Sequence, residues 1–376
     1  MSKRILVTST DLMMIQFLVP HIINLSENGY QVEIACSDVG GRVDEIRNKL
    51  KGYIEKIHIV RLKRSPVALI NCVGYQDIKK VIDHGNYDLI WTNEPVMGVM
   101  TRIAARKARK QGTKVFYMTH GFHFFKGAPK KNWMIFFPIE LYASRLCDVI
   151  VTVNQEDFRR AKKMHAPTVK YIHGIGINPN RLRESEKQTN IRTELGLSED
   201  NFVCISVGEL NENKNHQIVI RALGQLKNLD IHYIICGKGN QLDNLVNLAK
   251  EQSMQNNVHF LGYRMDVLDI CLQSDLFVFP SHREGLPIAP LEAMYCGLPL
   301  ITSNIRGPAD FMEDGITGYL VNPYDVNSFA AAIRKLKENS TLRLEMGNYN
   351  KGAVRPFLLN NSKKEVLNLV SEILDL

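Results

Sequence analysis

Short apolar runs alternate with longer segments in which apolar residues recur at helical spacing, and this alternation continues through most of the chain. Apolar runs of roughly four to eight residues, bounded by Gly, Pro, Asn or Asp, are typical of buried strands. In the first part of the chain they predict strands over residues 4–9, 31–36, 57–62, 87–92, 114–119, 148–154 and 169–173. Between them the pattern predicts helices over 14–25, 43–50, 66–84, 96–110 and 156–164, and an aromatic-rich helix inside 120–146.

The alternation lapses over residues 174–202, where glycines and then a charged polar stretch predict a linker and a first surface helix. It then begins again. We predict strands over 202–207, 231–236, 258–261, 275–279, 300–303 and 319–321, with helices between them. The chain ends with predicted helices over 329–337, 342–350 and 363–376, the last two separated by Gly352 and Pro356.

Strands that alternate with helices predict parallel sheets covered by helices on both faces. The fold class is therefore α/β, with two tandem Rossmann-like, doubly wound domains over residues 1–180 and 181–356. We expect the C-terminal helix, 357–376, to pack back on the first domain. We also expect the carboxyl ends of the two sheets to face a common cleft, because such sheets bind ligands at that edge.

Charge is distributed unevenly along the 376 residues, which have a net charge of +8. Residues 1–180 contain 27 Lys and Arg against 15 Asp and Glu, whereas residues 181–376 contain 20 against 24. A basic half suggests an anionic partner, and both nucleic acid and the cytoplasmic face of a membrane qualify. The seven scattered cysteines form no CxxC pair and suit a reducing cytoplasm, and no apolar run approaches the roughly 20 residues that span a bilayer. The first residues predict a strand rather than a signal peptide.

Two carboxylates stand eight residues apart after the predicted strand 275–279. Glu284 follows the carboxyl end of that strand, and Glu292 lies about one turn into the next helix. Free backbone N–H groups at the start of a helix bind anions, so this stretch suits a nucleotide sugar, with amides for the phosphate and carboxylates for hydroxyl groups. The structural alternative is an ordinary strand–helix unit with an acidic residue where the helix dipole favours it.

A second strand-to-helix turn contains Gly208 and Lys214, and a third contains Gly237-Lys238-Gly239. Lys214 near a helix start is disfavoured by the dipole and suits a diphosphate, although it is equally an ordinary surface lysine. A single GxG fits a tight turn as readily as a ligand loop.

In this order and at these spacings the motifs resemble the C-terminal half of the family 4 (group 1) retaining glycosyltransferases of the GT-B fold. The matching stretches are Val207-Gly208…Lys214-Asn215, Gly237-Lys238-Gly239, Phe260-Leu261-Gly262-Tyr263, Phe279-Pro280-Ser281…Glu284-Gly285-Leu286-Pro287…Glu292-Ala293-Met294 and Asp314-Gly315…Val321. The N-terminal half matches more loosely, through Phe17, Pro20, His120-Gly121 and residues 174–178. Members that make bacterial surface polysaccharides look most similar, notably over residues 120–127.

The resemblance implies a role for each matching residue. Glu292 would bind the ribose hydroxyls, Glu284 the donor sugar, and Lys214 the leaving phosphates. His120 would lie near the donor sugar and the acceptor, although a histidine at a strand end is often only structural. The remaining donor-binding positions are Gly285, Leu286, Pro287, Ile288, Ala289, Gly208, Glu209, Tyr263, Arg264, Gly237 and Lys238.

One departure concerns the phosphates, because the family usually has Arg where this chain has Glu209. Either Arg283, Arg264 or Lys238 shares the phosphate charge, or donor binding differs. The glycine pair common in the family's first loop is also absent, and Ser9-Thr10-Asp11 stands there.

The implied reaction moves a hexosyl or N-acetylhexosaminyl group, with retention, from a nucleotide sugar such as a UDP-sugar to a saccharide. The acceptor would be polyprenyl-diphosphate-linked, and the pathway would be capsular or exopolysaccharide biosynthesis, alongside other assembly proteins. We expect no cofactor and no metal, because no Asp-x-Asp pair is placed to hold one, and His120 and His123 have no evident third ligand.

The basic half also contains a segment that mixes aromatic residues with lysines. Its proposed acceptor and membrane residues are Phe122, His123, Phe124, Lys126, Lys130, Lys131 and Trp133. This composition suits the interface of an anionic membrane, so we expect a cytoplasmic protein bound peripherally to the inner face of the plasma membrane. The alternative is a core helix next to a solvated lysine turn. Arg102, Arg106, Lys107, Arg109 and Lys110 form a second basic face, which alone is usually solvated.

Other functions fit the sequence less well. The hydrolysing UDP-sugar 2-epimerases share the double fold but lack the pair of glutamates. An RNA-binding protein would use the basic half, yet there is no RNP-like motif or GXXG loop, so no nucleic-acid partner is expected. A nicotinamide dehydrogenase would need G-x-G-x-x-G after a strand.

Overall fold

The computed structural model describes residues 2–39, 43–179, 190–227 and 230–375, and these divide into two compact units. Unit 1 contains residues 1–176 and 360–376, and unit 2 contains residues 177–359. The domain boundary predicted between residues 180 and 181 lies outside the described residues.

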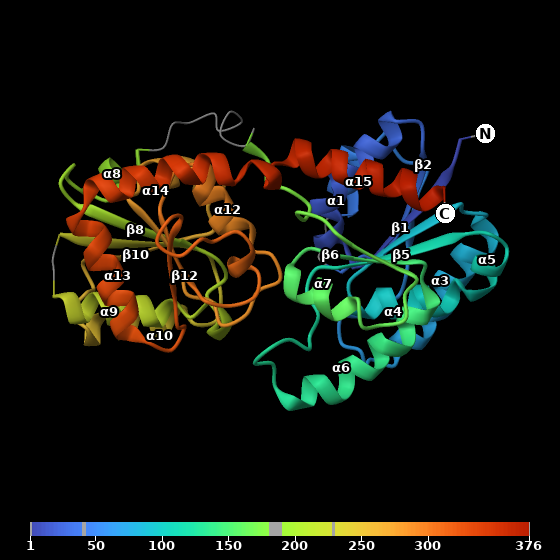
Figure 1. The fold of residues 1–376 in the computed structure, drawn as a ribbon, viewed down its shortest axis with the longest axis horizontal. Coiled ribbons are helices and arrows are strands. Elements are labelled where there is room, and N and C mark those ends of the chain that lie inside the picture. The colour runs from blue at the N-terminus through green and yellow to red at the C-terminus, as the bar shows by residue number, and fades with distance from the viewer. Residues whose placement is uncertain (1, 40–42, 180–189, 228–229, 376) are drawn as a thin grey trace. The chain divides into compact units, whose positions relative to one another are not determined.

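In its described part, unit 1 is built on a seven-stranded sheet of order β3-β2-β1-β4-β5-β6-β7, in which every neighbouring pair is parallel. The strands are β1 (Arg4–Asp11), β2 (Gln31–Ser37), β3 (Lys56–Ile59), β4 (Leu89–Asn93), β5 (Lys114–Thr119), β6 (Val149–Thr152) and β7 (Thr168–Tyr171). Its helices are α1 (Leu12–Glu27), α2 (Val43–Lys49), α3 (Ile70–Gly85), α4 (Pro95–Ala104), α5 (Arg106–Lys110), α6 (Lys130–Ala143), α7 (Gln155–Ala161) and α15 (Leu359–Leu374). The helices cover both faces of this sheet (Figure 1).

Unit 2 repeats the plan with a six-stranded parallel sheet of order β10-β9-β8-β11-β12-β13 among the described residues. Its strands are β8 (Phe202–Val207), β9 (Ile231–Cys236), β10 (Val258–Gly262), β11 (Leu276–Phe279), β12 (Leu300–Ser303) and β13 (Gly318–Val321). Its helices are α8 (Ile191–Glu194), α9 (His216–Leu226), α10 (Leu242–Glu251), α11 (Val267–Leu272), α12 (Ile288–Tyr295), α13 (Val326–Glu338) and α14 (Ser340–Ala353). The prediction of two doubly wound α/β domains is confirmed.

The central strands are apolar on both faces because helices cover both sides of each sheet. Ile5, Leu6 and Val7 of β1 are fully buried, as are Phe277 and Val278 of β11. Polar residues begin where these strands end, at the carboxyl edge of the sheet. Because the residues change from apolar to polar there, the candidate functional side chains of both units lie at that edge.

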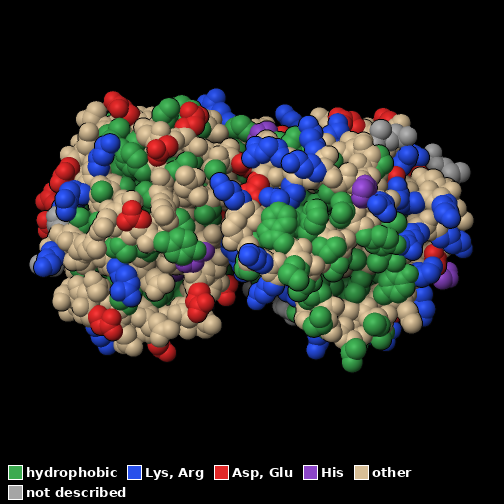
Figure 2. Space-filling view, turned by 60° about the horizontal axis from the view of Figure 1, so that its bottom comes forward, with side chains coloured by type: hydrophobic (Ala, Val, Ile, Leu, Met, Phe, Trp, Pro, Cys, Tyr) green, Lys and Arg blue, Asp and Glu red, His purple; other side chains and the backbone are tan. Residues whose placement is uncertain are grey.

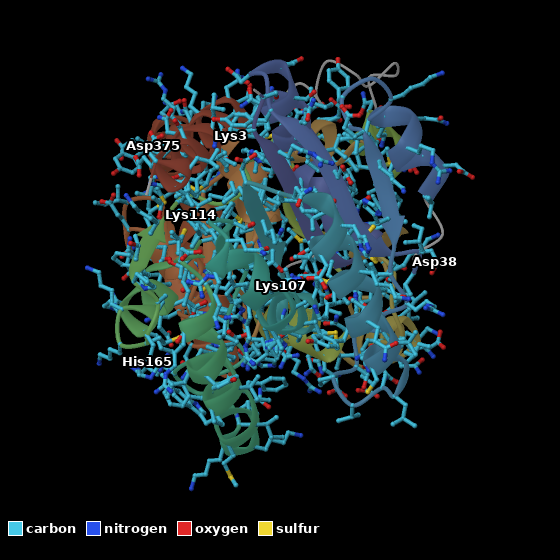
Figure 3. All side chains as sticks on the ribbon, turned by 90° about the vertical axis from the view of Figure 1, so that its right-hand side faces the viewer. Lys3, Asp38, Lys107, Lys114, His165 and Asp375 are labelled. Atoms are coloured by element: carbon cyan, nitrogen blue, oxygen red, sulfur yellow. The ribbon has the colours of Figure 1, made fainter. Side chains whose placement is uncertain are left out.

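Helix α15 belongs to unit 1 although it lies at the end of the chain. The Ser362 hydroxyl donates to the carbonyl of Gly174 at 2.5 Å, and Glu365 accepts from the backbone N–H of His173 at 3.0 Å. Figure 3 shows Asp375, at the end of this helix, near Lys3 at the start of β1. The last helix therefore packs against the segment that follows β7, and its end lies near the first residues of the chain.

The predicted helix over 96–110 is two helices, α4 and α5, that meet at Ala105. The prediction of a solvated basic face is wrong for Arg102, which is fully buried. Its guanidinium pairs with Glu140 of α6 at 2.7 Å and lies over the ring of Tyr117, 3.9 Å from the centroid. The reason is the helical register, which turns Arg102 toward β5 and α6 rather than toward solvent.

Candidate functional site

The strand order of unit 2 reverses between β8 and β11, which pair with each other at the middle of the sheet. In open α/β sheets, the carboxyl edge at such a switch point is where ligands bind. The loops that leave these two strands contain Gly208, Lys214 and Glu284. The structure therefore brings Glu284 together, at the expected position, with two residues that lie 70 or more positions before it in the sequence.

Lys214 and Glu284 form an ion pair across this switch point. The distance from Lys214 Nζ to Glu284 Oε1 is 2.8 Å, and the two side chains are only 21% and 14% exposed. The ammonium also lies 4.8 Å from the centroid of the Phe279 ring, and its stem runs along Gly208, where a Cβ would meet it at 3.2 Å. Several contacts thus fix one cation and one carboxylate at the centre of the sheet edge.

Gly237 and Gly239 allow two loops to pack closely. A Cβ on Gly237 would collide with the carbonyl oxygen of Gly208, and one on Gly239 with that of Leu210. Backbone hydrogen bonds join the same loops, from Gly208 N to Cys236 O at 3.0 Å and from Leu210 N to Lys238 O at 3.0 Å. The GxG motif is explained by this packing, which fixes the turn that contains Gly208.

The loop from Gly285 to Pro287 leads into α12 without a side-chain cap on the first turn. Backbone N–H groups at the start of a helix have no partner within the helix, so this turn presents donors to an anion. Gly307 supports the loop from behind: its φ is +89°, and a Cβ there would collide with the carbonyl oxygen of Gly285. Arg306 donates from Nε to the carbonyl oxygen of Glu284 at 2.9 Å.

Arg306 is a residue that the sequence did not reveal. It follows β12 by three positions and has no motif around it, so only the folded loop shows that it reaches the Glu284 backbone. Glu292 lies in the middle of α12 and is 7% exposed.

Arg264, Lys238 and Arg283 are the residues proposed to replace the phosphate-binding arginine, and their surroundings differ. Arg264 lies between two carboxylates, donating to Asp266 at 2.7 and 2.8 Å and to Glu194 at 2.9 Å, and these bonds raise the pKa of its guanidinium. Lys238 is exposed and makes no ion pair with any described residue, and its stem lies beside Gly262. The side chains of Glu209 and Arg283 are exposed, and that of Tyr263 is 65% exposed.

In unit 1, His120 lies at the end of β5 with its Nε2 3.0 Å from Asn93 Oδ1 at the end of β4. Burial lowers the pKa of His120 to about 4, so its ring is neutral at physiological pH. The histidine is therefore fixed at the carboxyl edge of the sheet as a hydrogen-bonding group.

The prediction that Phe122 and Phe124 meet a membrane is wrong. They are 3% and 0% exposed and stack on each other with centroids 4.8 Å apart, because the turn after β5 directs them beneath α6. Trp133 is half-buried, with the Arg160 guanidinium 4.5 Å over its ring. Of the acceptor and membrane residues proposed from the sequence, the ones with exposed side chains are His123, Lys126, Lys130 and Lys131.

The exposed apolar side chains of this region belong to α6 instead. Met134, Ile135, Ile139 and Tyr142 are 78, 52, 42 and 49% exposed. Their spacing places them along one side of the helix. Figure 2 shows hydrophobic side chains gathered on the face of unit 1 that includes α6, with Lys and Arg side chains along its border.

The described residues contain no group of three or more His, Cys, Asp or Glu side chains that could hold a metal ion. None of their helices is both long and apolar enough to cross a bilayer.

Comparison with known proteins identifies the class. The profile of the family described as Glycosyl transferases group 1 matches residues 187–353, and that of Glycosyltransferase Family 4 matches residues 22–181. The chain is 33% identical to the putative glycosyltransferase EpsD of Bacillus subtilis, over 100% of this chain and 98% of that relative. It is 25% identical to the UDP-Gal:alpha-D-GlcNAc-diphosphoundecaprenol alpha-1,3-galactosyltransferase of Escherichia coli, over 89% and 87% of the two chains.

The fold agrees with this class. Anabaena HepE, solved in complex with UDP, superposes with a TM-score of 0.78 over 99% of this chain and 100% of that chain, at 20% identity. The fold and the site thus define a GT-B glycosyltransferase. The chain belongs to the group 1 glycosyltransferases of family 4, as the sequence motifs predict.

Proposed function

We propose that this enzyme transfers a hexosyl or N-acetylhexosaminyl group, with retention, from a UDP-sugar to a polyprenyl-diphosphate-linked saccharide in surface-polysaccharide biosynthesis. The observation on which this rests is the Lys214–Glu284 pair at the switch point of unit 2, next to the uncapped start of α12. The lipid-linked acceptor is suggested by the activity named for the Escherichia coli relative. In this proposal unit 2 binds the donor and unit 1 the acceptor.

The chemistry follows from the leaving group. The bond between the anomeric carbon and the distal phosphate oxygen breaks, and its electrons stay on the phosphate. The acceptor hydroxyl bonds to the anomeric carbon on the same face, and its proton passes to the departing phosphate. Lys214 and the backbone N–H groups after Gly285 stabilise the charge that develops, and Glu284 holds the sugar.

The phosphate charge needs more than one cation, since Glu209 replaces the arginine usual in the family. In this proposal Lys238 supplies the second cation, because Arg264 is already paired with two carboxylates. Transfer then requires no metal ion, and activity is expected to persist in EDTA.

Substitution of the two glutamates tests the donor site. We expect Glu292→Ala to weaken UDP binding, because it removes the carboxylate assigned to the ribose, by about tenfold for one charge-assisted hydrogen bond. Glu284→Ala should lower kcat more than it changes UDP affinity. The measurements are UDP titration by calorimetry and UDP release in the presence of membrane-lipid extract. If both variants behave as wild type, the site is assigned wrongly.

The exposed face of α6 binds an anionic membrane in the same proposal. Met134 and Ile139 insert among the headgroups, and Lys130 and Lys131 contact anionic lipid. We expect wild type to float at low salt with vesicles that contain anionic lipid. Flotation should be weaker at about 0.5 M salt, because the Debye length is then only a few ångströms.

The double substitution Met134→Ser/Ile139→Ser should abolish most of this flotation. A matched control is Leu344→Ser, which removes a side chain that is 69% exposed on α14 of unit 2. Equal loss in both variants, or no flotation by wild type, would contradict membrane binding through α6.

A further inference from the structure

Unit 1 has its own switch point, and an unusual residue lies there. The strand order reverses between β1 and β4, which pair in parallel register. Glu94 follows the last residue of β4 and precedes Pro95, the first residue of α4. By the rule that applies to unit 2, a ligand of unit 1 binds at this point of the sheet edge.

The backbone of Glu94 is strained. Its φ is +61° and its ψ is 159°, a region occupied almost only by glycine. Two features of the turn from β4 into α4 accompany this geometry: Pro95 disfavours the helical region for the residue before it, and the Glu94 carbonyl accepts the first helical hydrogen bond, from Gly98 N at 2.9 Å. A glycine would fit this position without strain. The presence of a glutamate therefore needs a reason that lies in its side chain.

The side chain is held by one oxygen and leaves the other open. Oε2 accepts from the Ser9 hydroxyl at 2.5 Å and from Thr10 N at 2.9 Å, both at the end of β1. Oε1 makes no hydrogen bond to any described residue, although the side chain is only partly exposed. Burial raises the pKa of this carboxyl, so the carboxylate gains from a further hydrogen-bond donor.

The charges nearby indicate what kind of donor fits. Asp11 is buried beside Glu94 and pairs with Arg64, so among the residues that the structure describes the two carboxylates face one cation. An anion such as phosphate is disfavoured by this balance, whereas a neutral hydroxyl group is a suitable partner for Oε1. His120, linked to the neighbouring Asn93, adds a second neutral hydrogen-bonding group at the same edge.

We propose that Glu94 is an acceptor-binding residue, whose open carboxylate oxygen accepts a hydrogen bond from a hydroxyl group of the neutral sugar that receives the transferred residue. This inference rests on the proposed function, in which unit 1 binds the acceptor. It also explains the retained strain, because a residue with a binding role is kept even where glycine would be more stable.

Two substitutions of Glu94 separate the side chain from the backbone. Glu94→Ala keeps the strained backbone and removes the carboxylate, and it should raise the KM for the acceptor about tenfold or more while UDP affinity stays unchanged. Glu94→Gly should raise the KM similarly, and its Tm should exceed that of Glu94→Ala by about 2–4 °C for a unit of this size, because both variants lose the bonds from Ser9 and Thr10 and only alanine keeps the strain. The control is Glu55→Gln, an exposed carboxylate just before β3 at the opposite edge of the sheet, which should change neither quantity.

The full-length enzyme is assayed with UDP-sugars and a synthetic N-acetylglucosaminyl diphospho-lipid, and with membrane-lipid extract as a second acceptor source. If wild type transfers sugar and Glu94→Ala has an unchanged acceptor KM, this inference is overturned and the proposed function stands. A Tm for Glu94→Gly no higher than that of Glu94→Ala overturns the strain argument. If wild type releases no UDP with any acceptor and binds none, the proposed function fails.

Discussion

Replacing Lys214 by alanine is expected to lower kcat by about 10²–10³-fold, the usual cost of removing one preorganised group that stabilises transition-state charge. Lys214 is already positioned for this role before substrate binds, since its ammonium is fixed by Glu284 and the Phe279 ring. Binding of the leaving diphosphate would exchange one anionic partner for another without moving the lysine far. The KM for the donor should change less than kcat.

The matched control is Lys250→Ala, an exposed lysine on α10 without an ion-pair partner among the described residues, for which kcat should be unchanged. The effects of Lys214→Ala and Glu284→Ala should not add in the double variant, because the two side chains are in contact. A fall in Tm with kcat intact would show that the ion pair is structural, and the assignment of Lys214 would then be abandoned.

The elements of the fold follow from the sequence because local pattern determines them. The runs at β8 and β11 are apolar in every residue but one, and strands covered on both faces need such runs. The order of the strands in the sheet cannot be predicted from local sequence patterns. The reversal of strand order between β8 and β11 nevertheless determines the position of the site. The resemblance to known glycosyltransferases supplied that information, and the structure agrees with it.

Side-chain direction was the part that the sequence could not determine. Phe122 and Phe124 have the composition of a membrane-facing segment, but aromatic residues serve equally in a core, and only the turn after β5 decides between the two. Arg102 likewise looks like a member of a solvated basic face until α6 places Glu140 against it. In both cases a contact between segments that are distant in sequence reversed the prediction.

Glu94 illustrates a different limit. A Glu-Pro pair after a strand predicts a turn, but the sign of φ depends on how α4 must leave the sheet to pack on it. Backbone strain is therefore invisible in the sequence and becomes evidence for function only once the turn is seen.

Removing the Glu140 carboxylate is expected to destabilise unit 1 by about 3–5 kcal/mol, because Glu140→Ala leaves the Arg102 charge buried and unpaired. The guanidinium has no solvent exposure, and its one other hydrogen bond to a described residue is from Nε to the Gly98 carbonyl at 2.8 Å. Urea denaturation of the variant and wild type would measure the difference in the free energy of unfolding.

The double variant Arg102→Met/Glu140→Leu is the informative partner, since it replaces the buried pair by apolar side chains of similar size. Such replacements are often neutral or stabilising by roughly 1–4 kcal/mol, so this variant should be at least as stable as wild type. Because the pair joins α4 to α6, Glu140→Ala should also loosen α6, the helix that presents Met134 and Ile139. Vesicle flotation should therefore weaken in Glu140→Ala and recover in the double variant. Equal stability of Glu140→Ala and wild type would mean that Arg102 reaches water when its partner is lost, and that the ion pair does not hold α6 in place.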